Sequence, residues 1–259
     1  MAEKNENYKE LVFRLARTDF KLRYHGSFLG YIWAILKPLL LFTILNFVFS
    51  RIFNTRNNGI PFYSLQLLTG LLLFNFFAEG TTAGIGSFLT KAQLVTKAYS
   101  PKWVIVVSST INALFVFCAN IVVLAIFFAF YHKLPSLEGV GVFLLCVVFL
   151  YILIVAVVLL LAPLLVRFRD IAMIWEVLLT AVMYASPIVY PLSILPKNIQ
   201  NIILLNPIAF VIYYAKEGII LNNFISPSKI IIFGACVIAV TGVCFLCFRK
   251  TQKNIAEYI

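Results

Sequence analysis

The sequence predicts an all-α integral membrane protein with six transmembrane helices and both termini in the cytosol. First, 62% of the 259 residues are hydrophobic and 12% are charged, with a mean hydropathy of +0.98, whereas soluble domains are about half apolar and about a quarter charged. Second, the apolar residues form runs of roughly 20 residues, the length that a helix needs to cross a bilayer. Third, cytosolic termini place most Lys and Arg residues on the cytosolic side, as the positive-inside rule requires.

Residues 1–28 are expected to form a cytosolic amphipathic helix that lies in the membrane interface. Charged and apolar residues recur at helical spacing on two different faces: Glu10, Arg14, Arg17 and Lys21 on one, and Leu11, Val12, Leu15 and Leu22 on the other. This pattern suits a helix with its apolar side in the acyl chains and its cations at the headgroups. The alternative is an ordinary solvated surface helix.

Residues 29–259 are expected to form the six-span domain. The spans are predicted at residues 30–49, 65–89, 103–130, 140–166, 171–189 and 230–248. Between the last two spans, residues 191–220 contain two apolar pieces separated by Asn206 and Pro207. Each piece is too short to cross the membrane. We therefore expect two short re-entrant helices in the outer leaflet, because a broken backbone is tolerated there where protein covers it.

Two cytosolic segments are candidates for contact with a partner. Residues 90–103, between spans two and three, are long enough for a short helix at the membrane surface, and Pro101 ends it. Between spans four and five there is a tight charged turn that contains Arg167, Arg169 and Asp170. The alternative is that both segments only carry charges that set the topology.

Three ionisable residues are predicted within the membrane, and one of them, Glu176 in span five, is expected to have a structural role by pairing with Arg167 or Arg169. Glu79 lies near the middle of span two, beside Gly80, Gly84 and Gly86. It lines a pore or is a packing residue beside closely approaching helices. Lys37 lies about two turns into span one, and it either extends to the headgroups or holds an anionic group at the cytosolic mouth of a pathway.

No enzymatic site is predicted. The two histidines, His25 and His132, lie on opposite sides of the membrane, so a catalytic triad or a histidine metal cluster is not expected. Cys244 and Cys247 have the spacing of a metal pair but lie in an apolar run without a second pair of ligands. The sequence has no phosphate-binding Gly-x-x-x-x-Gly-Lys loop. Transport would therefore take its energy from another subunit or from an ion gradient.

The net charge of +11 reflects the concentration of Lys and Arg on the cytosolic side of the membrane, and no nucleic-acid partner is expected.

Aromatic residues make up 15% of the chain. Most of them fit lipid-facing and interfacial positions. Some are well placed to line a passage, where their rings would stack on the C–H faces of sugars: Tyr31, Trp33, Phe74, Phe76, Phe77, Tyr184 and Tyr190.

The chain resembles the membrane subunits of type-2 ABC exporters for polysaccharides, which serve O-antigen, capsule-like glycan and wall teichoic acid export. The matching residues are Asp19-Phe-Lys-Leu-Arg-Tyr-His-Gly-Ser-Phe-Leu-Gly-Tyr-Ile-Trp-Ala-Ile-Leu-Lys-Pro38, Phe168-Arg-Asp-Ile171, Ser186-Pro-Ile-Val-Tyr-Pro191, Leu195-Pro196 and Leu205-Asn-Pro207. One departure is Lys37, where an uncharged Asn or Trp is expected.

The resemblance implies a homodimer in the bacterial cytoplasmic membrane, joined by two copies of a cytosolic ATPase that carries ATP and Mg. This chain itself would bind no cofactor. Spans one, two and five would form a passage at the dimer interface, lined by the aromatic residues above with Lys37 and Glu79. The substrate would be a glycan on a polyprenyl pyrophosphate lipid. Contact with the ATPase would come from Leu94, Val95, Thr96, Lys97, Ala98, Tyr99, Ser100, Arg167, Arg169 and Asp170.

Two alternatives remain open from the sequence. One is a type-2 ABC efflux permease for a drug or a small lipid, which needs no continuous sugar-sized passage. The other is a membrane scaffold or ion-coupled carrier that works without an ATPase. The few intramembrane charges weaken the carrier, because a proton relay needs a chain of ionisable groups.

Overall fold

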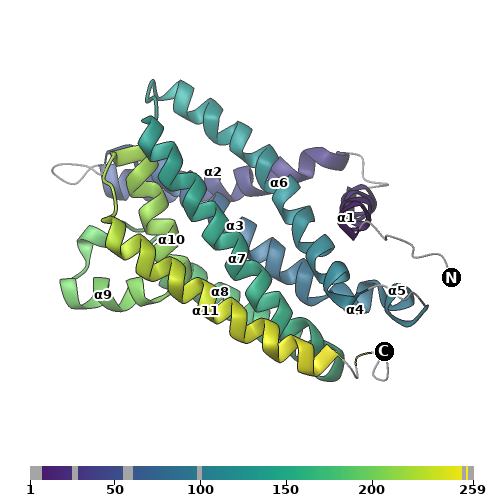
Figure 1. The fold of residues 1–259 in the computed structure, drawn as a ribbon. Coiled ribbons are helices and arrows are strands. Elements are labelled where there is room, and N and C mark those ends of the chain that lie inside the picture. Colours follow the sequence, from purple (N-terminus) through teal and green to yellow (C-terminus); the bar gives the residue numbers. More distant parts are fainter. Residues whose placement is uncertain (1–7, 25–28, 55–60, 98–100, 253–254, 256–259) are drawn as a thin grey trace.

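The computed structural model describes residues 8–24, 29–54, 61–97, 101–252 and 255, and every regular element in these ranges is helical (Figure 1). This confirms the all-α prediction. Four helices are long and apolar enough to cross a membrane: α2 (Trp33–Asn54) with the preceding 3-10 turn η1 (Gly30–Ile32), α6 (Lys102–Phe130), α7 (Leu137–Arg167) and α11 (Pro227–Thr251).

Helix α3 (Tyr63–Ile85) is the centre of the bundle. It packs against α2, α6 and α7, and Leu65, Leu68 and Phe77 on it are almost completely buried. Gln66, Asn75 and Glu79 lie within it, and it is not among the four helices that are apolar enough to be counted as spans. Its central position covers polar side chains such as Gln66 with protein, and membrane helices carry polar residues mainly where they face the interior of a bundle.

Helix α8 (Ile171–Ala185) has 15 residues, fewer than the roughly 20 that cross the hydrocarbon core. It packs against α3 and leaves apolar side chains such as Met173 and Val177 exposed. In the described residues there are therefore four full-length apolar helices, or five if a bent pair counts as one span, where the sequence predicts six.

The bent pair occupies the region of the two predicted short helices. It consists of α9 (Lys197–Leu205) and α10 (Pro207–Lys216), which continues as the π-helical turn η3 (Glu217–Leu221). The helix axis bends by 112° between the two halves. Asn206 causes the break: its Oδ1 accepts a hydrogen bond from the N–H of Ile208 (3.0 Å), and Pro207 takes the first position of α10. The 3-10 turn η2 (Leu192–Ile194) precedes the pair.

Helix α1 (Tyr8–Tyr24) lies against α6. Val12 and Ala16 are buried in this contact, and the ring of Phe20 meets that of Phe115 on α6 edge to face. Leu22, predicted on the same apolar face, is 68% exposed. Most of the apolar face of α1 therefore packs on protein, and Leu22 lies outside the contact.

Two short helices, α4 (Ser87–Thr90) and α5 (Ala92–Lys97), follow α3. They lie at the end of the bundle where α1 is found and where α11 ends (Figure 1). A direct contact supports this arrangement, since Lys102 Nζ at the start of α6 donates to the backbone oxygen of Gln252 just after α11 (2.5 Å). Segments from both ends of the chain therefore meet on one side of the bundle.

Candidate functional site

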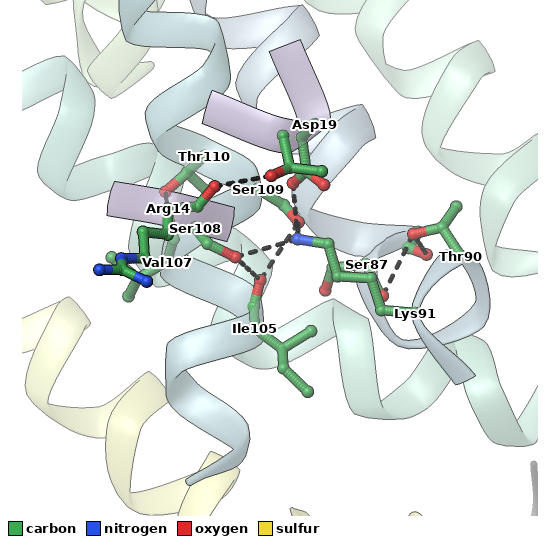
Figure 2. A network of polar contacts seen from close by, with 12 residues as sticks. Arg14, Asp19, Ser87, Thr90, Lys91, Ile105, Val107, Ser108, Ser109 and Thr110 are labelled. Carbon is green, nitrogen blue, oxygen red and sulfur yellow. Dashed lines mark hydrogen bonds and ion pairs between the residues drawn. The ribbon is translucent and has the colours of Figure 1, made fainter. Parts of the chain in front are cut away.

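A polar junction joins α1, α6 and the α4–α5 segment (Figure 2). Lys91, which separates α4 from α5, places its Nζ 2.6 Å from Asp19 Oδ2 on α1. The same Nζ donates to the hydroxyls of Ser108 and Ser109 on α6, both at 2.9 Å. We call these four residues the Lys91 junction.

Local backbone geometry and hydrogen bonds orient the lysine and both serines of the Lys91 junction. The backbone leaves α-helical geometry at Lys91, which ends α4 there. Both serine hydroxyls donate to the backbone oxygen of Ile105, which leaves their lone pairs to accept from the lysine. An ammonium has three donors, and here each finds an acceptor. With side chains of Lys91 and Asp19 only 10% and 22% exposed, this is a partly buried, saturated ion pair.

The predicted ATPase-contact residues are partly described. Leu94 and Thr96 on α5 are exposed, whereas Val95 is buried and anchors α5 to the bundle. Ala98, Tyr99 and Ser100 lie outside the described residues, as does the side chain of Lys97. The remaining three, in the turn between α7 and α8, are all exposed: Arg167, Arg169 and Asp170.

A pocket of about 590 Å³ lies between α2, α3 and α6. It brings Lys37 and Glu79, two of the three predicted intramembrane charges, to one cavity. Lys37 is exposed and Glu79 is half-buried. The rest of the lining mixes amide and hydroxyl groups with small and apolar residues: Pro38, Leu41, Asn75, Ala78, Thr82, Ala83 and Asn112.

A second pocket of about 780 Å³ lies next to the Lys91 junction. Its walls come from α1, the α4–α5 segment and α6, and they include Asp19, Lys91 and Ser109. Two residues, Ala83 and Asn112, line both pockets. The pockets therefore adjoin along α3 and α6.

Three predicted passage residues lie in the protein core. Phe74, Phe76 and Phe77 are 6%, 3% and 1% exposed. Phe76 stacks on Phe117 of α6 with ring centroids 4.5 Å apart, and the ring of Phe77 lies 6.2 Å from that of Trp175 on α8. Helices of the same chain cover these rings, so we correct their assignment from passage lining to core packing.

The other predicted aromatics are more accessible. Trp33 and Tyr184 are 42% and 70% exposed, and Tyr190 is half-buried. Tyr31 is 52% exposed and stacks on Phe20 of α1 with centroids 5.2 Å apart. None of these four is among the residues that line the two pockets, so the structure does not gather them around Lys37 and Glu79.

Sequence reasoning missed two asparagines on α6. Asn112 lines both pockets and is 5% exposed. Asn120 donates from Nδ2 to the backbone oxygen of Ala34 (3.3 Å), the carbonyl that Pro38 cannot bond because proline has no N–H. Both asparagines could have been recognised from the sequence. Placing an amide within a long apolar membrane helix costs free energy unless the amide has a hydrogen-bond partner or a function.

The comparisons with known proteins cover most of the chain. Residues 10–220 match the family described as ABC-2 type transporter. Two relatives from Klebsiella pneumoniae, each named O-antigen export system permease protein RfbA, are 29% and 28% identical over 250 residues, which span 96% of this chain and 95% of each relative. A protein of the same name from Myxococcus xanthus is 29% identical over 202 residues, or 77% of this chain and 76% of that protein.

Proposed function

Because this chain belongs to the ABC-2 type transporter family, we propose that it is the permease subunit of an ATP-driven exporter for O-antigen or a related polysaccharide. The observation that carries the substrate is the similarity to permeases named for O-antigen export along 96% of the chain. The protein is a multi-pass integral membrane protein of the bacterial cytoplasmic membrane, in keeping with its long apolar helices.

We further propose six spans, with α3 and α8 as the second and fifth, and cytosolic termini. The bent pair α9–α10 would re-enter from the outer side and narrow the exit. Two copies would associate through α2 and α8, which leave large apolar side chains exposed: Phe47 is 69% and Met173 is 73% exposed. A passage between the copies would carry a glycan attached to a polyprenyl pyrophosphate lipid.

Energy would come from two copies of a cytosolic ATPase subunit, because the chain has no phosphate-binding loop of its own. The exposed face of α5, with Leu94 and Thr96, would dock into that subunit. The Lys91 junction would then transmit movement of α5 directly to α1 and α6, since one ammonium is bonded to both helices.

Depletion of this protein in its native cell tests the proposal. Long lipid-linked glycan should accumulate inside the cell and disappear from the surface, as measured by lipid extraction and surface labelling. Unchanged glycan in both places would overturn the polysaccharide assignment. An efflux permease for a drug or small lipid would then be the next candidate, tested by drug sensitivity and lipid composition of the depleted cells.

Substitution Lys37→Ala should slow export by about tenfold, because a hydrogen bond to a charged group contributes roughly 1.5–3 kcal/mol. The pocket lined by Lys37 and Glu79 would lose the cation that meets the pyrophosphate. Protein abundance should fall much less than export, since the Lys37 side chain is exposed. Export rate and membrane abundance are measured in the same cells, with Lys37→Arg as the charge-retaining control. Equal loss of both quantities would show a structural role.

A further inference from the structure

Asn112 is the least satisfied polar group where the two pockets adjoin. It is 5% exposed, and its Oδ1 is buried without a hydrogen-bond partner among the residues that the structure describes. Burying a carbonyl oxygen without a partner costs roughly 1–3 kcal/mol. The chain nevertheless places this amide beside two cavities. One is lined by Lys37 and the other by Ser109, and Ala83 lines both.

The neighbouring polar groups on α6 have more hydrogen bonds than Asn112. One turn before Asn112, Ser109 is engaged by Lys91. Two turns after it, Asn120 donates from Nδ2 to the backbone oxygens of Ala34 and Val116, while its Oδ1 is buried without a partner among the described residues. Of these three residues, Asn112 is the one that lines both large pockets and has an amide oxygen without a described partner, whereas Asn120 lines only a separate cavity of about 10 Å³. An unused amide beside a cavity points to a ligand.

We propose that Asn112 binds a hydroxyl-bearing lipid head group at the junction of the two pockets. A carboxamide has an accepting oxygen and a donating nitrogen, and the side chain can turn to present either edge. A bare phosphate only accepts and would leave Oδ1 unsatisfied. An ammonium only donates and would leave Nδ2 unsatisfied. A pair of hydroxyl groups both donates and accepts, so it satisfies both edges.

The surrounding lining suits the same chemistry. Asn75 and Thr82 on α3 offer further groups that donate and accept, and Pro38 and Leu41 on α2 present apolar surface to C–H groups. Hydroxyls of this kind come from the first sugar of the exported lipid-linked glycan or from the glycerol of phosphatidylglycerol. The sugar is the source inferred here, and this choice rests on the proposed function.

Binding to the full-length protein in phosphatidylcholine nanodiscs tests the inference. The probes are a polyprenyl diphosphate carrying one N-acetylglucosamine, the same polyprenyl diphosphate without sugar, and phosphatidylglycerol. We expect the sugar-bearing probe to bind about tenfold more tightly than the other two, and Asn112→Leu to remove this preference. Leucine removes an unsatisfied amide at similar volume, so folding should not suffer. As a control, Asn120→Leu should lower thermal stability yet keep the preference.

Three results would overturn the inference. Equal binding of all three probes to the unchanged protein would show that the sugar is not recognised, and preference for phosphatidylglycerol would assign the site to a structural lipid. A sugar preference unaffected by Asn112→Leu would place recognition elsewhere. In each of these cases the depletion experiment decides the proposed function separately, because glycan export by the unchanged protein does not depend on where Asn112 acts.

Discussion

Replacing Lys91 with methionine should reduce export by about tenfold or more, because loss of one partner of a largely buried ion pair costs up to roughly 3–5 kcal/mol. Asp19 would remain 22% exposed without its cation, and the hydroxyls of Ser108 and Ser109 would lose the donor they share. The contact between α1 and α6 would loosen where the α4–α5 segment joins it. Export is measured by surface labelling and abundance by immunoblot of the membrane fraction.

A role in transmitting movement makes a second prediction for the same variant. The purified complex with its ATPase should continue to hydrolyse ATP while exporting less glycan per ATP. A residue needed only for folding would instead lower both activities together with the amount of protein. Methionine is chosen because it keeps the length and apolar stem of lysine, so the packing around Lys91 is preserved.

The chain supplies a matched control on the same helix. Arg14 and Glu10 also form an ion pair on α1, but their side chains are 76% and 54% exposed. Exposed pairs contribute about 0–1 kcal/mol, so Glu10→Gln should change export less than about twofold. The charge exchange Asp19→Lys with Lys91→Asp should recover part of the export, because serine hydroxyls can donate to a carboxylate. Normal export by Lys91→Met would contradict the coupling role.

The long apolar helices were predictable because lipid imposes a length and a composition on them. The sequence predicts spans at 103–130, 140–166 and 230–248, and the structure has α6 from 102 to 130, α7 from 137 to 167 and α11 from 227 to 251. The extra residues are polar or capping ones that hydropathy leaves out. Ser136, for example, accepts a hydrogen bond from the N–H of Gly139 and begins α7 before its apolar run.

Helix α3 shows why the passage aromatics were harder to predict. Its apolar residues surround the axis, so the sequence carries no periodic signal for a covered and an open face. Composition identifies Phe74, Phe76 and Phe77 as membrane residues, but only the packing of α6 and α8 around α3 shows that they are core. Glu79, on the same helix, was predicted as pore lining or packing, and it lines a pocket on the side towards α2.

The Lys91 junction could not be derived from local sequence at all. Asp19 and Lys91 lie 72 residues apart, and Ser108 lies a further 17 along the chain. A lysine in a predicted cytosolic loop is adequately explained as a topology signal, so its pairing becomes visible only when α1 is placed against α6. Local patterns determine helices, whereas polar pairs between helices depend on the tertiary arrangement.

The second large effect on function is expected from substitution of Gly84, where α3 packs against Val158 of α7. A Cβ atom built on Gly84 would lie 2.5 Å and 2.6 Å from the two methyl carbons of Val158, closer than atoms can pack. Gly80, one turn earlier, is limited in the same way by Ile154 at 2.9 Å. Small residues at this four-residue spacing let membrane helices approach closely. Gly84→Leu should therefore prevent α3 from docking and abolish accumulation of the folded protein.

A graded series separates this steric effect from a general intolerance of α3. Gly84→Ala should lower stability by about 1–3 kcal/mol, the usual cost of overpacking, and Val158→Ala in the same chain should restore most of it by removing the two clashing methyl carbons. Gly242→Ala on α11, where nothing lies within 4 Å of an added Cβ, should leave stability unchanged. Thermal unfolding of the detergent-solubilised protein and its yield measure these effects. If Gly84→Leu accumulates normally, α3 and α7 do not pack as described, and the pockets formed around α3 would have to be reconsidered with them.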